Sequence, residues 1–166
     1  MVMRFFCLAL CCLLLTGCAV VPASSTLPTT ESPTISETRH VETVTLFLPN
    51  ENADGFLKTT VEVPQITETI LVEQLIAAGV LTEGTQINTL SYDAGAKHLK
   101  ADFNDSFRLL LQTMGTSGEY MIIGSVVNTF LSAFDANTIS ITVDGKVLET
   151  GHSVYDQPLS FYPDNT

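Results

Sequence analysis

The chain has 166 residues and a formal net charge of −11, from 18 acidic and 7 basic side chains. This length accommodates one folded domain and leaves no room for several. The acidic balance argues against nucleic acid as a partner, since its binding needs lysine and arginine clustered on one face. It argues equally against electrostatic attachment of the protein surface to anionic lipid.

The N-terminus has the layout of a secretory signal peptide. Arg4 supplies positive charge, residues 5–15 form an apolar run, and two small residues follow. The stretch LTGC, which ends at Cys18, resembles the bacterial lipobox, where a signal peptidase cuts before the cysteine and the sulfur receives a diacylglyceryl group. We therefore predict a lipoprotein signal peptide over residues 1–17 and palmitate-type acylation of Cys18. The lipid would hold the protein on the cell membrane, outside the cytoplasm.

An uncleaved transmembrane anchor is the alternative interpretation of this leader. Residues 19–21 extend the apolar run toward the roughly 20 residues that a spanning helix needs. Gly17 and Cys18 interrupt the run, Pro22 follows it, and a basic flank is missing. We favour the lipoprotein signal for these reasons.

The cysteines are confined to the start of the chain: Cys7, Cys11, Cys12 and Cys18. Because none follows, we expect neither a disulfide framework nor a thiolate metal site in the folded part.

Residues 18–41 are expected to form a tether between the lipidated cysteine and the domain. Serine and threonine dominate this stretch, three prolines are spaced through it, and apolar residues show no periodic register. Such a composition cannot bury enough surface to become ordered. The tether would give the domain reach above the bilayer, or it would serve only as a spacer for export and lipidation.

The folded domain, predicted over residues 42–166, is expected to open with a β-hairpin. Val44, Leu46 and Leu48 alternate with Thr45 and Phe47, and turn-forming residues follow over positions 50–55. Four residues of the second strand are predicted to share a face: Leu57, Thr59, Val61 and Val63.

A helix and a second hairpin are predicted next. Apolar residues recur at three- and four-residue spacing from about Thr67, and Gly79 is a natural stop. Two strands follow over residues 86–92 and 97–103. In the second, three residues are predicted to face inward, Leu99, Ala101 and Phe103, and three outward, His98, Lys100 and Asp102.

A second helix and a third hairpin complete the predicted order. Thr116 and Glu119 have the spacing of a capping box at the start of the helix. The strand over residues 139–143 alternates, and Asp144-Gly145 is a strong hairpin turn into Val147 and Leu148. We expect an α+β fold: a mixed sheet of hairpins with two helices packed on one face.

These segments resemble the GerMN domain, a module of sporulation and germination lipoproteins and of other bacterial envelope proteins. The resemblance covers nearly the whole folded part. The residues that carry it are Val44–Asn50 with its terminal proline, VEQLIAAG at residues 72–79, Gly84-Thr85, ADFNDSF at residues 101–107, and residues 125–149 with Val127-Asn128-Thr129 and Val143-Asp144-Gly145-Lys146.

The sequence departs from the family pattern in two places. A proline often follows the first helix in the family, whereas Val80 follows Gly79 here. The sporulation protein that names the family carries two such domains, and this chain has one. The resemblance implies a fold similar to the ring-building domains of secretion and sporulation channels, with lateral self-association and a role in sporulation or germination.

Candidate catalytic and metal-binding residues form no recognisable constellation. Ser125 is predicted to lie within a helix, and the three histidines, His40, His98 and His152, do not pair at metal-ligand spacing. Asp102, Asn104 and Ser106 have the spacing that opens a calcium loop, but Phe107 and Thr113 stand where that loop needs glycine and a carboxylate. We favour a helix-entry turn there. We expect Asn128 to tie its helix to a neighbouring loop.

The sequence therefore predicts no enzyme, no catalytic residue, no cofactor and no metal. We expect an envelope-anchored interaction module that binds the membrane through Cys18 and presents sheet edges or helix faces to envelope proteins, with self-association included. The alternative is a lipid-anchored binder of a small molecule or a cell-wall fragment, which would need an apolar pocket. A hydrolase is the third candidate.

Overall fold

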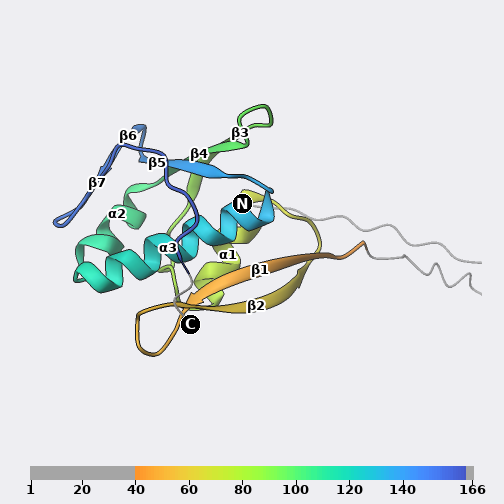
Figure 1. Ribbon diagram of the computed structural model, residues 1–166, viewed down its shortest axis with the longest axis horizontal. Helices are drawn as coiled ribbons and strands as arrows, with labels where there is room; N and C mark the ends of the chain where they lie inside the picture. The colour runs from red at the N-terminus through yellow and green to blue at the C-terminus, as the bar shows by residue number, and fades with distance from the viewer. Residues whose placement is uncertain (1–39, 164–166) are drawn as a thin grey trace, which may run out of the picture. The chain divides into compact units, whose positions relative to one another are not determined.

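The computed structural model describes residues 40–163 (Figure 1). The predicted signal peptide, Cys18 and nearly all of the tether lie outside these residues. The described elements, in chain order, are β1 (Glu42–Pro49), β2 (Phe56–Val63), α1 (Glu68–Ala77), β3 (Ile87–Asp93), β4 (His98–Phe103), α2 (Asp105–Gln112), α3 (Thr116–Ala133), β5 (Thr138–Val143), β6 (Lys146–Glu149) and β7 (Val154–Tyr155).

The strands form two sheets. β1 and β2 make an antiparallel pair, and the other strands make a five-stranded sheet in the order β3-β4-β5-β6-β7. In that sheet β4 and β5 run parallel, while the other neighbours are antiparallel. The predicted α+β class and the three hairpins are confirmed. The predicted number of helices is wrong, because the described residues contain three and not two.

The helix that the sequence did not reveal is α2. It has eight residues, and it buries Phe107, Leu110 and Leu111 at helical spacing. A segment of eight residues gives only a weak periodic signal of a helix. The helix-entry turn favoured at Asn104 was nevertheless consistent with a helix at this place. Asn104 is indeed the residue at which the chain enters this helix.

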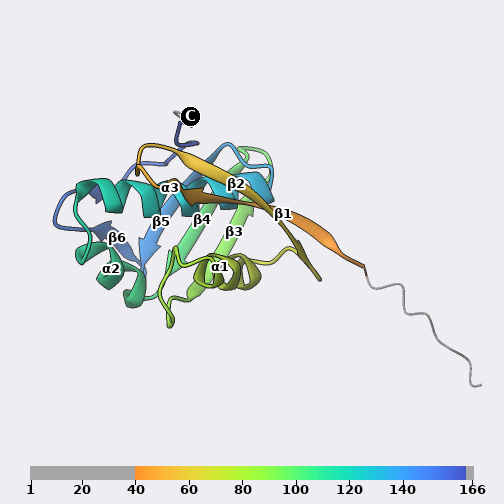
Figure 2. The same cartoon turned by 90° about the horizontal axis from the view of Figure 1, so that it is seen from below.

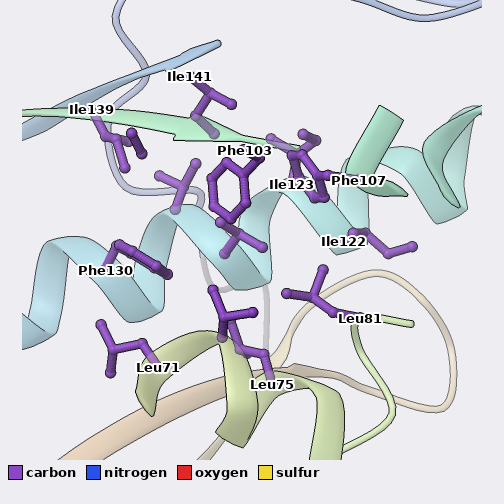
Figure 3. Packing of buried hydrophobic residues seen from close by; sticks show 14 of the residues in the cluster. Leu71, Leu75, Leu81, Phe103, Phe107, Ile122, Ile123, Phe130, Ile139 and Ile141 are labelled. Atoms are coloured by element: carbon purple, nitrogen blue, oxygen red, sulfur yellow. The ribbon is translucent and has the colours of Figure 1, made fainter. Parts of the chain in front are cut away.

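The long helix α3 lies between the two sheets (Figure 1). Every residue from Met121 to Leu131 is buried, so this helix is covered on all sides. Figure 3 shows Phe103, Ile139 and Ile141 of the five-stranded sheet on one side of α3, and Leu71 and Leu75 of α1 on another. All five belong to the main hydrophobic cluster. Figure 2 shows α1 beside the β3 end of that sheet.

Helix α1 begins and ends as its sequence predicts. The Thr67 hydroxyl accepts a hydrogen bond from the Ile70 N–H at 3.2 Å. Gly79 follows the helix with φ of 76°, and the Val80 N–H returns to the Leu75 carbonyl. Val80, at the family's proline position, is buried in the core.

The start of α3 differs from the prediction. Gly115 is the N-cap residue and Thr116 is already helical, so the capping box is wrong. Glu119 does not return to the helix start. It is 2% exposed and faces the C-terminal part of the chain.

The first hairpin also corrects an expectation about which residues face inward. Phe47, assigned by alternation to the outer face, is buried with Phe56 and Met121, and Tyr162 packs against them. Leu57, predicted to share a face with Val61 and Val63, is 53% exposed. The burial of Phe47 has a tertiary cause, because Met121 of α3 and Tyr162 of the C-terminal segment cover that side of the hairpin.

The end of the sheet combines a confirmed turn with an unpredicted strand. Asp144 and Gly145 both have positive φ, 49° and 72°, as a two-residue hairpin of type I′ requires. β7 has only two residues and pairs with β6, which is too short for an alternating pattern to reveal.

Gly124 allows the first hairpin to approach α3 closely. A Cβ atom at this position would lie 2.3 Å from Cζ of Phe56 and 3.0 Å from Cδ1 of Tyr162. Real atoms do not approach so closely, and both rings are packed into the core. The missing side chain is therefore a packing requirement of the interface between helix and hairpin.

We predict that Gly124→Ala lowers the free energy of unfolding by about 1–3 kcal/mol, because the added methyl group forces Phe56 out of place. Urea unfolding followed by circular dichroism measures the change. Gly151→Ala is the matched control, since a Cβ there would meet nothing within 4 Å. Equal stability of the two variants would show that the hairpin can move away without loss.

Candidate functional site

The histidines lie at separate places on the described surface. His98, on the sheet face away from α3, has Nδ1 at 2.8 Å from the Thr138 hydroxyl and Nε2 at 3.2 Å from that of Ser140. His152 has Nε2 at 3.3 Å from the Met114 carbonyl oxygen. Within residues 40–163, no group of three or more His, Cys, Asp or Glu could hold a metal ion.

Asp102 ties three strands together at one end of the sheet. Its carboxylate accepts hydrogen bonds from the Thr142 hydroxyl at 2.6 Å, the Gly145 N–H at 2.8 Å and the Asn88 amide at 2.9 Å. Burial acts to raise the pKa of Asp102, but the three donors together outweigh it, so its pKa lies below the ordinary value. This carboxylate is a structural acceptor in the sheet.

Asn104 joins the start of β3 to the end of β4. Its side-chain oxygen accepts from the Gln86 N–H at 3.1 Å, and its amide donates to the Gly84 carbonyl at 2.8 Å. With Asp102 and Asn104 both engaged in this way, the structure gives the segment the role of a helix entry, as favoured from the sequence.

Asn128 links α3 to the C-terminal segment, as expected from the sequence. Its amide donates to the Tyr162 carbonyl at 3.1 Å, and its oxygen accepts from the Tyr162 N–H at 2.8 Å. The pair of bonds holds the C-terminal segment on α3. Ser125, also on α3 and fully buried, has a hydroxyl oxygen without a hydrogen-bond partner among the described residues.

Glu119 is the polar residue whose role the sequence did not reveal. One carboxylate oxygen, Oε1, accepts from the Tyr155 hydroxyl at 2.7 Å and from the Thr150 hydroxyl at 2.8 Å. The other, Oε2, is buried without a partner in the described part of the chain. One sequence signal could have predicted its burial. Glu119 lies three and four residues before Ile122 and Ile123, and residues at these spacings share one face of a helix.

Two tyrosines near Glu119 hold their protons tightly. Burial raises the pKa of Tyr155, and its hydrogen bond to Glu119 raises it further. Burial also raises the pKa of Tyr162 to about 12, with smaller contributions from Tyr120 and Glu119. Both phenols are therefore neutral at physiological pH, and that of Tyr155 donates to Glu119.

Among the hollows of the described surface, two grooves lie beside α1. The α1–β3 groove has a volume of about 340 Å³ and lies between one face of α1 and the entry to β3. Its lining residues are Thr69, Val72, Glu73, Ile76, Gly84, Thr85, Gln86 and Ile87. The apolar groove, about 500 Å³, is lined by Leu48, Pro49, Leu57, Ala78, Gly79, Val80, Leu81, Thr82, Leu110, Met114 and Ile122.

A family model described as Germane, sporulation and spore germination, matches residues 45–149. The chain belongs to the Germane family. The match runs from β1 to the end of β6, so the α1–β3 groove, Asp102 and Asn128 are parts of the Germane domain. The partners of Glu119, Thr150 and Tyr155, follow the matched region.

A solved structure of GerMN domains has a similar fold. The tandem GerMN domains of the sporulation protein GerM from Bacillus subtilis match with a TM-score of 0.55 and 17% identity, over 82% of this chain and 51% of that chain. The first GerMN domain of the same protein matches with a TM-score of 0.49 and 17% identity, over 75% of this chain and 98% of that chain. The present chain thus spans about half of the tandem chain. A search of curated proteins by sequence found no significant match.

The predicted membership of the GerMN family is confirmed by these matches. They relate the domain to sporulation and germination proteins. Within residues 40–163, no helix has both the length and the apolar character needed to cross a membrane.

We predict that Glu119→Ala destabilises the Germane domain by about 2–3 kcal/mol, because two hydroxyl groups lose a charged acceptor in a largely buried place. Glu119→Gln retains one acceptor oxygen, so its stability should lie between those of the Ala variant and the wild type. Urea unfolding gives the values. Glu149→Ala, at an exposed carboxylate, should stay within about 0.5 kcal/mol. An unchanged Ala variant would contradict the assigned role.

We predict that stability declines at high pH because of the raised tyrosine pKa values. An unfolded tyrosine ionises near its ordinary pKa of 10, while folded Tyr162 keeps its proton to about 12. The unfolded state therefore binds fewer protons in this interval, so the contribution is complete below pH 10 and is lost as pH rises through 12. Melting temperatures across this range should fall less for Tyr162→Phe than for wild type. An identical decline would contradict the prediction.

Proposed function

We propose that this protein is a lipid-anchored, non-catalytic binding module of the bacterial cell envelope, acting on other envelope proteins in sporulation or germination. Cys18 would carry the lipid, residues 18–41 would form the tether, and the Germane domain would provide the binding surface. The protein would work outside the cytoplasm on the membrane that receives the lipid.

The observation that carries this proposal is the use of polar side chains as ties between distant segments. Asp102 joins three strands, Asn128 holds the C-terminal segment, and Glu119 holds the chain around β7. Residue types that perform catalysis elsewhere are here committed to the stability of the domain. The open parts of the domain are grooves and strand edges, which are features that bind.

The comparisons support the biological setting. The matched family is described as sporulation and spore germination, and GerM is named as a sporulation protein. The lipobox at Cys18 supports the location, since a signal of this kind directs a protein through the membrane and leaves it attached by acyl chains.

A second candidate function is the capture of an apolar small molecule or cell-wall fragment. The apolar groove favours it, because about 500 Å³ lies within the usual range of ligand pockets and its lining is mainly aliphatic. Native mass spectrometry of the purified protein distinguishes the two candidates. A retained ligand that is lost in Leu57→Lys supports this second function.

We predict that Cys18→Ala abolishes palmitate labelling and releases the protein from the membrane fraction, whereas Cys12→Ala, which changes a cysteine inside the leader, leaves both unchanged. The physical reason is that attachment depends on acyl chains carried by one sulfur atom. Labelling of host cells with a palmitate analogue, followed by fractionation, measures the result. Labelling that survives in Cys18→Ala would overturn the anchor.

A crosslinking experiment in the same host cells tests the binding function. Crosslinking at the membrane should join the wild-type protein to discrete envelope proteins, and Cys18→Ala should lose these products because the protein no longer lies beside its partners. Turnover of a substrate by the purified protein, or absence of any crosslinked product in wild-type cells, would overturn the proposed function.

A further inference from the structure

We propose that the α1–β3 groove and the free edge of β3 together form a docking site for an extended basic segment of a partner protein. The segment would add a strand to the edge of the five-stranded sheet and place a lysine or arginine side chain in the groove. This inference rests on the proposed function, since it names the chemistry of the partner that the binding module takes.

The first observation is the distribution of charge. From Thr59 to Ala96, the stretch that contains α1 and β3, the chain has five acidic residues and no lysine or arginine. The acidic residues are Glu62, Glu68, Glu73, Glu83 and Asp93. Basic residues of the described part lie elsewhere in the chain, at Lys58, Lys97, Lys100, Arg108 and Lys146. The α1–β3 part of the domain therefore lacks counter-charges of its own.

The carboxylates near the groove are available to a partner. Glu73 lines the groove, while Glu68 and Glu83 are the chain neighbours of the lining residues Thr69 and Gly84. None of these three carboxylates has a hydrogen bond or ion pair within residues 40–163. By contrast, Lys97 and Arg108 already pair with aspartates of the domain.

Lys100 does not neutralise this surface. It pairs with Ser91 across β3 and β4, and alternation places it beside His98 and Asp102 on the sheet face away from α1.

The second observation is the edge of β3. This strand has seven residues and forms one border of the sheet, and among residues 40–163 it pairs with β4 alone. Edge strands are usually guarded by lysine, proline or a bulge along their length. The sequence INTLSYD contains no lysine or proline, and its register irregularity lies at the first residues, between Ile87 and Thr89. The remaining backbone groups are therefore open to a further strand.

The other described edges fit a partner strand less well. β1 packs against α3, and its Phe47 N–H already donates to the Thr129 hydroxyl. β2 carries Lys58 and Glu62 along its length, and β7 has only two residues.

The third observation is the shape and lining of the groove. Val72, Ile76 and Ile87 give it an apolar floor, while Glu73 contributes a carboxylate. Lysine and arginine bury their aliphatic stems on apolar surface and keep the charged head at the rim. A volume of about 340 Å³ is ample for such a side chain. Because Gln86 and Ile87 line the groove and Ile87 is the first residue of β3, a strand added to this edge brings its side chains past the groove.

The test uses the full chain in neutral detergent and a short fluorescent peptide that alternates arginine with valine. Fluorescence anisotropy should show binding that weakens as salt is raised, since the contact is between opposite charges. A matched peptide with glutamate in place of arginine should not bind. A peptide N-methylated at alternate residues lacks the donors for a strand ladder and should bind at least about tenfold more weakly.

Two variants with the same change of charge locate the site. Glu73→Lys should weaken binding of the arginine–valine peptide at least about tenfold, and Glu149→Lys, at an exposed carboxylate of β6 outside the groove, should change it less than about twofold. Glu73→Gln should give an intermediate loss. Glu73 is exposed, so urea unfolding should show equal stability for all variants.

Three results would overturn the docking site. They are the absence of binding by the arginine–valine peptide, equal binding by the N-methylated peptide, and equal weakening by Glu73→Lys and Glu149→Lys. Photo-crosslinks from the peptide that map to the apolar groove, or to a second copy of the chain bound at β3, would overturn it as well.

Failure of the docking site is distinguishable from failure of the proposed function. If Glu73→Lys keeps every crosslinked partner of the wild type in host cells, the groove is wrong and the binding function stands. If wild-type protein yields no crosslinked partner, the function itself fails.

Discussion

The rest of the domain depends on the complete burial of α3. From Met121 to Leu131 every residue of this helix is buried, most of them apolar, so the helix must be covered from every side. The five-stranded sheet covers one side, α1 and α2 cover others, and the β1–β2 hairpin closes the last. Gly124 is the point where this closure is tightest, since the ring of Phe56 occupies the space of a side chain. Detachment of any of these layers would expose α3 to water. We therefore expect the described residues to unfold as one cooperative unit.

Around this helix, polar residues join segments that are far apart in the chain. Glu119 and Asn128 are 36 and 34 residues from the tyrosines that they hold. Asp102 and the Gly145 N–H are 43 residues apart. Each tie satisfies groups that burial would otherwise penalise. These three residues, whose types take part in catalysis in other proteins, stabilise the fold here. The surface features left to bind a partner are the strand edges and the grooves.

Local patterns in the sequence predicted those parts of the fold that local physics determines. The Thr67 cap, the Gly79 stop and the Asp144-Gly145 turn depend on neighbouring residues only, and all three are present. α2 and β7 are too short to show a period. The burial of Phe47 depends on where α3 and the C-terminal segment run, which no alternation of nearby residues encodes. Glu119 was misassigned because its partners come long after it in the chain.

The candidate functional sites also differ in whether the local sequence or only the fold reveals them. The lipidation of Cys18 is predicted from a contiguous motif, because signals of this kind are recognised as linear sequence. The α1–β3 groove cannot be predicted in this way, because it arises where one face of α1 meets the residues that enter β3. The total charge of −11 already opposed nucleic acid as a partner, but only the fold shows that the acidic residues of α1 and β3 share a border of the sheet.

This placement of charge also bears on which strand can pair with β3. Proteins anchored on one membrane meet their own copies often, and an open edge strand invites pairing between copies. Two copies joined at β3 would bring together two surfaces of the same acidic sign, since each copy has five acidic residues and no lysine or arginine from Thr59 to Ala96. Like charges oppose such a pairing, whereas a basic strand relieves their repulsion. In the proposed docking site, the same carboxylates would therefore disfavour self-pairing at this edge and favour a basic partner.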